Sequence, residues 1–273
     1  MGLTEIDMIG RTSFEVAALR AAEDRRPDRL FADPHAAVFL DAAGFPATPE
    51  PVGRDFVTVM AEQVAVRTRF LDEALTAAAA DGCRQVVLVA SGMDSRAWRL
   101  DWPAGTELFE LDQPGVLRFK DEVMSDAPRR VRHAVPVDLR ADWPTELLRA
   151  GFRTDRKVAW LVEGLLYALD ETASDQLLAT ITSLSAPGSR LAFDHLECGA
   201  ALRAALTGMQ PGLAALWQSG PTDPAAWLRR HGWRPDLCEL GPVARGYGRR
   251  AHGDYDLAEG GTAHAWLGRA QLL

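Results

Sequence analysis

Five short apolar segments, separated by helical segments, run through the middle of this 273-residue chain and limit the folds that it can adopt. Each segment is apolar on both of its alternating faces, which is typical of parallel strands covered by helices on two sides. The predicted strands are residues 85–90, 106–111, 133–137, 158–163 and 190–195. Helical patterns separate them, so the sequence predicts an α/β fold with a doubly wound sheet.

Helical patterns also flank the strands. Residues 12–40 predict two or three helices interrupted by prolines, and residues 56–82 predict one long helix. After the fifth strand, residues 196–220 form two amphipathic stretches divided by Pro211 and Gly212. The remaining residues can supply a helix and two closing strands. No repeat or low-complexity linker interrupts this order, so we expect a single domain.

Charge and cysteine content exclude several classes of protein. The chain has 30 basic and 38 acidic residues and a formal charge of -8, so it lacks the positive field that nucleic acid binding requires. No apolar run reaches the roughly 18 residues that span a bilayer. The three cysteines form no CxxC pair and are typical of free thiols in a reducing compartment. We therefore expect a cytoplasmic protein with neither a membrane nor a nucleic acid partner.

The first predicted strand ends in the turn "VASGMDSR", where Ala90 and Gly92 remove side-chain bulk. In an open α/β sheet, ligands bind beyond the carboxyl ends of the strands, and glycine lets the backbone approach a ligand closely. The alternative is a tight turn that needs glycine for its own geometry. The GxGxxG and GxxxxGKS fingerprints are both absent, which removes most of the argument for a nicotinamide cofactor or a phosphate loop.

Acidic residues follow the next three predicted strands. Glu110 and Asp112 end the second strand on one face, where a carboxylate can accept hydrogen bonds from both hydroxyls of a ribose. Asp138 follows the third strand, and for both aspartates the alternative is a helix cap. Glu163 follows the fourth strand in apolar surroundings, so its carboxylate requires a partner or a ligand.

A glycine after the first strand and acids after the next three resemble the S-adenosylmethionine-dependent methyltransferases. The chain is similar in particular to the leucine carboxyl methyltransferase-like family, in its bacterial branch of small-molecule O-methyltransferases. The most specific motifs are "SGMDSRAWRL" followed by "ELDQP", and the likeness extends from Arg11 to Arg249. It implies S-adenosyl-L-methionine as cofactor and a Rossmann-like class I sheet of seven strands, the last one antiparallel, with N-terminal helices and a helical lid insertion.

The resemblance also implies how one methyltransferase domain over residues 1–273 is divided. The expected parts are an N-terminal helical cap that contributes to the cofactor site, a cofactor-binding core, a lid insertion, and a C-terminal helix with closing strands, at residues 1–82, 83–195, 196–220 and 221–273.

Site residues follow from the same resemblance. Arg20 and Arg67 are expected to hold the methionine carboxylate of the cofactor, with Arg69 as an alternative to Arg67 and surface arginines as the other interpretation. Glu163 is expected beside the methionine portion, where its charge can pair with the amino group. The family usually has glycine where this chain has Ala90 or Ser91. The remaining expected contacts are the turn (Ala90, Ser91, Gly92), the ribose (Asp112, Gln113) and the adenine (Asp138, Leu139).

Three residues are candidates for catalysis, namely Glu163, Tyr167 and His195. Family members commonly read EGLLMYL, so the tyrosine of "EGLLYAL" stands one position early, and the alternative for Tyr167 is a partly buried aromatic with a hydrogen-bonded hydroxyl. His195 ends the fifth strand and is expected to face the crevice as a base, with a structural histidine as the alternative. A phenol benefits from a base, whereas a carboxylate needs none. We expect no metal site at His195, Glu197 and Cys198.

The acceptor is the least determined part of this hypothesis. The apolar face of the lid insertion either covers an apolar substrate or faces the core. The bacterial branch is associated with polyketides and other secondary metabolites, and the high alanine and arginine content is typical of a GC-rich bacterial genome, which favours a small-molecule acceptor. The alternatives are a protein or peptide carboxyl methyltransferase, and a cofactor-binding homologue that no longer methylates. The sequence leaves the oligomeric state open.

Overall fold

The computed structural model describes residues 8–45, 54–209, 215, 217–218 and 220–273. Within these residues, seven strands form one sheet with the order β3-β2-β1-β4-β5-β7-β6. Strands β1 to β5 pair in parallel, and β7 is antiparallel to both β5 and β6. The bounds are β1 (Gln85–Val89), β2 (Glu107–Asp112), β3 (Val131–Pro136), β4 (Val158–Val162), β5 (Arg190–Leu196), β6 (Trp233–Glu239) and β7 (Ala265–Leu272). The predicted doubly wound sheet with an antiparallel last strand is confirmed.

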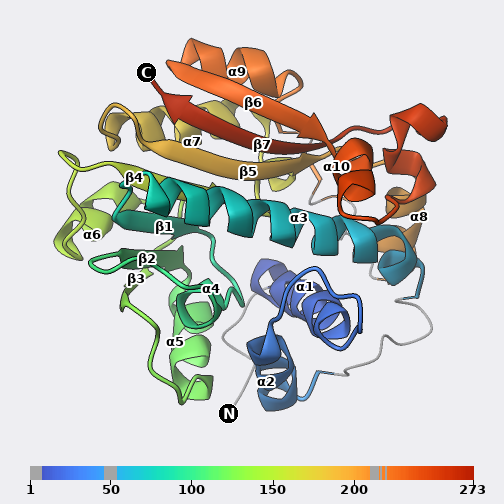
Figure 1. The fold of residues 1–273 in the computed structure, drawn as a ribbon, viewed down its shortest axis with the longest axis horizontal. Coiled ribbons are helices and arrows are strands. Elements are labelled where there is room, and N and C mark those ends of the chain that lie inside the picture. Colours follow the sequence, from blue (N-terminus) through green and yellow to red (C-terminus); the bar gives the residue numbers. More distant parts are fainter. Residues whose placement is uncertain (1–7, 46–53, 210–214, 216, 219) are drawn as a thin grey trace.

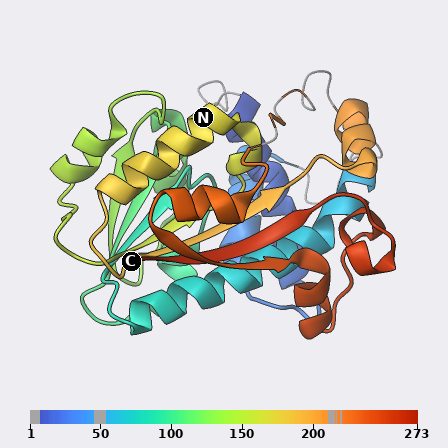
Figure 2. The ribbon, with the colours of Figure 1, turned by 90° about the horizontal axis from the view of Figure 1, so that it is seen from above.

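Helices cover both faces of the sheet, and Figure 2 shows α3 and α7 on opposite sides of it. On one face, Val86 and Leu88 of β1 belong to the same apolar cluster as α3. On the other face, Val87 and Val89 join a cluster with α6, α7 and α9. The helices are α1 (Met8–Asp24), α2 (Pro34–Ala43), α3 (Arg54–Ala80), α4 (Arg96–Arg99), α5 (Pro114–Val123), α6 (Trp143–Arg149), α7 (Glu171–Ser183), α8 (Ala200–Met209), α9 (Pro224–Arg230) and α10 (Leu240–Gly246), with 3-10 turns η3 (Leu166–Ala168), η5 (Gly253–Tyr255) and η6 (Leu257–Glu259). This burial on both faces explains why the strands are apolar at consecutive positions.

The N-terminal helices pack at one end of the sheet, where α1 contacts both α2 and α3 (Figure 1). Asp33 and Pro34 separate α1 from α2, since the Asp33 side chain accepts a hydrogen bond from the backbone N–H of Ala36 and the proline occupies the first turn. Gly44 ends α2 in the left-handed conformation. The short helices α4, α6 and α10 were not expected from the periodicity.

The lid insertion is described in part. Its first amphipathic stretch forms α8, which packs against α3, whereas most of its second stretch, including Pro211 and Gly212, lies outside the described residues. Leu202 and Leu206 of α8 are buried in the cluster around α3. The predicted division of the chain into cap, core, lid and closing segments stays a prediction. Among the described helices, none is long and apolar enough to cross a membrane.

Candidate functional site

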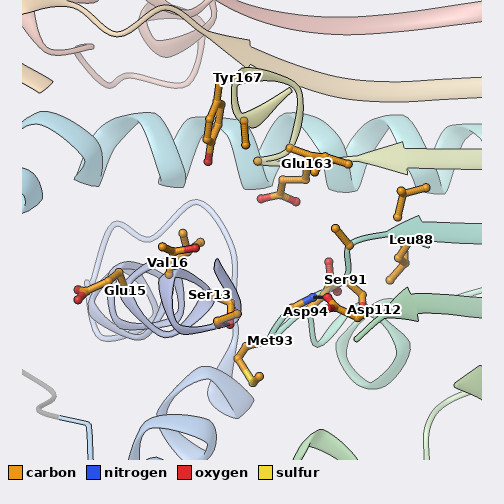
Figure 3. Close-up of a pocket in the computed structure, with 18 of the residues that line it drawn as sticks. Ser13, Glu15, Val16, Leu88, Ser91, Met93, Asp94, Asp112, Glu163 and Tyr167 are labelled. Carbon is orange, nitrogen blue, oxygen red and sulfur yellow. Dashed lines mark hydrogen bonds between the residues drawn. The ribbon is translucent and has the colours of Figure 1, made fainter. Parts of the chain in front are cut away.

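A cavity of about 240 Å³ lies beyond the carboxyl ends of β1, β2 and β4, where the strand order reverses. Figure 3 shows side chains from these strand ends, from α1 and from Tyr167 around it. Sequence-predicted residues that line it are Arg20, Arg67, Ala90, Ser91, Gly92, Asp112, Gln113, Glu163 and Tyr167. Residues from the N-terminal helices that periodicity did not single out also line it, among them Ser13, Glu15, Val16, Phe56 and Met60. The position agrees with the rule for ligand sites in open α/β sheets.

The turn after β1 forms the floor of this cavity and has unusual backbone geometry. Gly92 has a φ of +48°, and a Cβ atom placed on it would lie 2.9 Å from the Cβ of Ser13. Ala90 has a φ of +54° and is the one non-glycine residue with positive φ among those described. Glycine adopts this region at little cost, so the structure explains why a relative would have glycine at Ala90. At Gly92 both the conformation and the close approach of α1 require glycine.

Asp112 at the end of β2 is tied to this turn. Its Oδ2 atom accepts a hydrogen bond from the backbone N–H of Gly92 at 2.6 Å, and its Oδ1 atom accepts one from Gln113 at 2.7 Å. Burial raises the pKa of Asp112, and the two hydrogen bonds oppose that shift. The first turn of α5 has no side-chain cap. The helix-cap alternative for Asp112 is therefore wrong.

Glu110 is paired with two cationic side chains of the protein. It is fully buried, and its Oε2 atom lies 2.7 Å from Lys120 Nζ and 3.0 Å from Arg132 Nη2. Glu110 does not line the cavity, although it precedes Asp112 by two residues.

Glu163 lies between two buried arginines. Its Oε1 atom is 3.0 Å from Nε of Arg67, and its Oε2 atom is 2.7 Å from Nη1 of Arg96. Burial alone would raise the pKa of Glu163, but the charges of Arg96 and Arg67 outweigh burial and hold it below its ordinary value. Arg67 also donates from Nη1 to Asp194 at 3.0 Å. Of the two expected alternatives for the Glu163 carboxylate, a partner or a ligand, the structure supplies protein partners.

These contacts belong to one connected ionic network beneath the cavity. Arg96 pairs with Asp94 and, at 2.6 Å, with Asp72, and Asp72 in turn pairs with Arg99. Arg20 donates from Nε to Asp33 at 2.9 Å and from Nη2 to the carbonyl of Met93 at 2.5 Å. Across the described residues, five carboxylates meet four guanidinium groups in this network, namely Asp33, Asp72, Asp94, Glu163 and Asp194 with Arg20, Arg67, Arg96 and Arg99. Carboxylates outnumber arginines, so the network can accommodate a ligand of positive charge.

Tyr167 and Trp217 form one wall of the cavity. Their rings are stacked, with centroids 4.2 Å apart and planes at 5°. Burial raises the pKa of Tyr167 to about 12, against the opposing charge of Arg67. The alternative for Tyr167, a partly buried aromatic with a hydrogen-bonded hydroxyl, agrees with this environment. Leu206 of α8 lines the cavity too, so the lid insertion faces both the core and the site.

His195 is not among the residues that line the cavity. Successive strand residues point to opposite faces, and Asp194 points to α3, where it accepts hydrogen bonds from Gln63 and Arg67. His195 therefore points to the other face. Its ring is 1% exposed and stacks on Trp266 with centroids 5.4 Å apart. The expectation that its imidazole faces the crevice is wrong, because the strand alternation directs it away.

Asp138 and Leu139 also lie outside the cavity lining. The side chain of Asp138 is 42% exposed, and its hydrogen bonds from Arg140 lower its pKa to about 2. The backbone N–H of Val137 donates to the carbonyl of Asp112, which keeps this segment beside the end of β2. A role at the adenine stays a prediction. Among the described residues, no group of three His, Cys, Asp or Glu side chains is arranged to hold a metal ion.

The sequence of this chain is similar to those of known methyltransferases. Residues 13–182 match the family model described as leucine carboxyl methyltransferase. A protein of Parafrankia sp., provisionally named an S-adenosyl-L-methionine-dependent methyltransferase, is 46% identical over 238 residues, which are 83% of this chain and 77% of that protein. A protein of Frankia alni with the same provisional name is 43% identical over 267 residues, 92% of each chain.

A solved structure has a similar fold. The crystal structure of a protein from Thermobifida fusca, provisionally named a methyltransferase, has a TM-score of 0.61 and 15% identity over 86% of this chain and 93% of that one. At this identity the likeness concerns the fold alone.

Proposed function

The chain belongs to the leucine carboxyl methyltransferase family and uses S-adenosylmethionine as a methyl donor, and from this premise we propose that it methylates an oxygen atom of a small, largely apolar molecule. The observation that carries the proposal is one cavity whose lining has two chemically different kinds of side chain. Its lining combines the glycine turn and the carboxylates of Asp112 and Glu163 with apolar and aromatic side chains such as Leu206, Tyr167 and Trp217. The turn and the carboxylates suit the cofactor, and the apolar and aromatic side chains suit an acceptor.

The residues present fit the cofactor. Gly92 keeps the floor of the cavity free of a side chain, next to Ser13 of α1. A carboxylate has about four lone-pair positions, so Asp112 can accept from the two ribose hydroxyls beyond its two backbone hydrogen bonds. Gln113 lies beside it. Ala90 and Ser91 complete the turn that contacts the cofactor.

The ionic network suits the methionine portion. We propose that Glu163 pairs with the amino group and that Arg20 and Arg67 bind the carboxylate, since all three residues line the cavity. Both arginines have ion-pair partners already, but a guanidinium has five N–H groups and can serve a second acceptor. A sulfonium adds one positive charge to a zwitterionic amino acid. The excess of carboxylates over arginines in the network favours that charge.

The bound cofactor supplies a methyl group on a positively charged sulfur, which an acceptor oxygen displaces in line. The protein contributes by holding the acceptor at the open side of that methyl and by excluding water from it. Tyr167, Leu206 and Trp217 provide the apolar wall for this purpose. With a pKa of about 12, Tyr167 is protonated at neutral pH, so it donates a hydrogen bond or packs rather than removing a proton.

The experiment that tests this function is product identification with methyl-labelled S-adenosylmethionine. A crude metabolite extract from a GC-rich actinobacterium should give a labelled product that is heavier than its acceptor by one added methyl group. Base hydrolysis should release the label if the acceptor was a carboxylate and retain it if the acceptor was a hydroxyl. Labelled peptide or protein instead would favour a peptide carboxyl methyltransferase. Cofactor binding without product from any acceptor would contradict the proposal.

A further inference from the structure

Glu15 of α1 is a carboxylate that lines the cavity and has no partner among the described residues. It takes part in no hydrogen bond or ion pair there, whereas Arg20 on the same helix is held by Asp33 and by the carbonyl of Met93. Figure 3 shows Glu15 and Asp112 on opposite sides of the group of drawn residues, with Val16 and Glu163 between them. Glu15 therefore belongs to the side of the cavity away from the cofactor turn.

The other carboxylates of the cavity are already satisfied. Asp112 accepts two backbone hydrogen bonds, Glu163 pairs with two arginines, and Asp94 pairs with Arg96. The cavity's cations, Arg20 and Arg67, are likewise paired with carboxylates. Glu15 is thus the charged group of the described lining that remains available to a second ligand.

The apolar surroundings of Glu15 make a charged carboxylate without a partner energetically unfavourable. Val16, Phe56 and Met60 also line the cavity, and burial raises the pKa of Glu15 with no neighbouring charge to offset it. A partly buried carboxylate in apolar surroundings gains from any donor or cation that enters. A carboxylate acceptor would instead meet a like charge.

We propose that Glu15 binds a hydrogen-bond donor or cationic group on the acceptor, so that the enzyme selects hydroxylated or amine-bearing apolar molecules and disfavours carboxylates. This inference rests on the proposed function, since it assigns the acceptor class of that same cavity. It makes Glu15 a specificity-determining residue at the acceptor side.

Three phenols that differ only in their distal group test the proposal. Tyramine is cationic, tyrosol is neutral with a hydroxyl, and 4-hydroxyphenylacetate is anionic. Their binding to the full chain saturated with S-adenosylhomocysteine is measured by calorimetry at neutral pH. We expect tyramine to bind most tightly and 4-hydroxyphenylacetate least, with the extremes separated by about tenfold.

Glu15→Gln is the test variant, and Glu122→Gln on the exposed surface of α5 is the control. We expect Glu15→Gln to reduce the preference for tyramine over 4-hydroxyphenylacetate to about twofold or less, and Glu15→Lys to reverse it. The control should keep the wild-type order. Affinity for S-adenosylhomocysteine alone should stay unchanged in all three variants, which shows that each is folded.

An order that persists in Glu15→Gln would overturn the inference, and so would a failure of all three phenols to bind at millimolar concentration. These outcomes differ from failure of the proposed function. If the phenols bind in the expected order but no methyl-labelled product forms from any acceptor, the O-methyltransferase proposal fails while the role of Glu15 in recognition stands.

Discussion

The carboxylate of Asp112 accepts the backbone N–H of Gly92 at 2.6 Å, and this hydrogen bond joins the ends of the two strands that form the floor of the cavity. It fixes the acid beside Gly92, the one position of this turn that has no side chain. Asp112 therefore has two roles, since it holds the turn in place and keeps acceptor capacity for a ligand.

Asp112→Ala should weaken S-adenosylhomocysteine binding by about tenfold or more, because hydrogen bonds to a charged acceptor contribute about 1.5 to 3 kcal/mol. Asp112→Asn, which keeps the shape, should lose less. Calorimetry measures both dissociation constants, and Asp41→Ala on the exposed side of α2 is the control. An unchanged dissociation constant for Asp112→Ala would remove this residue from the cofactor site.

Gly92→Ala should destabilise the fold and impair cofactor binding. A left-handed backbone costs a non-glycine residue about 1 to 2 kcal/mol, and the added Cβ would also lie 2.9 Å from the Cβ of Ser13. The double variant Gly92→Ala with Ser13→Gly removes the steric conflict but keeps the backbone cost. Because a glycine inside α1 has its own helix cost, Ser13→Gly alone is the reference for the double variant. Thermal unfolding should show that Gly92→Ala lowers the melting temperature less in the Ser13→Gly background than in the wild type, and equal losses in both backgrounds would mean that α1 does not press on this turn.

Ala90→Gly should be neutral or stabilising by up to about 1 kcal/mol, because it removes a left-handed alanine while adding flexibility to the unfolded chain. The matched substitution Ala179→Gly, on the exposed face of α7, should instead destabilise by about 1 kcal/mol. Chemical denaturation measures the two free energies of unfolding. Destabilisation of similar size in both variants would show that the strain at Ala90 is not present in solution.

Asp94 makes the fold sensitive to acid. Burial opposes its charge, but Arg96 and the other nearby cations together outweigh burial and lower the pKa of Asp94 to about 2 from an ordinary value of 3.8. A lowered folded-state pKa contributes stability that is fully present above the unfolded value and is lost as the pH falls toward the folded value. The shift corresponds to about 2 kcal/mol.

Asp94→Asn should therefore lose stability at pH 7 and show a shallower loss between pH 4 and pH 2 than the wild type, as measured by denaturation across that range. Asp138→Asn is the control, since the pKa of Asp138 is lowered to a similar value but its carboxylate is exposed and screened. Parallel stability curves for wild type and Asp94→Asn would contradict the assignment.

The sequence predicts the sheet well because its signals are local. Buried strands such as 85–90 are apolar on both faces, and a glycine turn followed by an acid at the end of the next strand is a short motif. Partners within the ionic network are not predictable in this way. Asp72 and Arg96 are 24 residues apart, and only the packing of α3 on the turn after β1 brings them within 2.6 Å.

The direction in which a side chain points is the second feature that the sequence predicts poorly. The sequence predicts that His195 lies at the carboxyl end of the fifth strand, and the structure confirms this position. The face of the sheet on which its side chain lies depends on the register of β5 with β7, which the sequence does not give. Glu15 gave no signal because a single acid on an amphipathic helix resembles an ordinary exposed residue. Its significance depends on Phe56 and Met60 of α3, which lie more than 40 residues further along the chain.

His195→Ala decides whether this histidine is a base or a structural residue. Its ring is buried on the face away from Asp194 and stacks on Trp266, so we expect a loss of about 1 to 3 kcal/mol in folding stability and little change in affinity for S-adenosylhomocysteine. His195→Phe keeps the stacking and should recover much of that stability. With a hydroxyl acceptor at saturation, turnover in His195→Phe should fall less than about tenfold, and its pH profile should match the wild type. A general base contributes about two to four orders of magnitude, so a loss of that size in a stable His195→Phe variant would restore the histidine as the base and require it to reach the cavity in the acceptor complex.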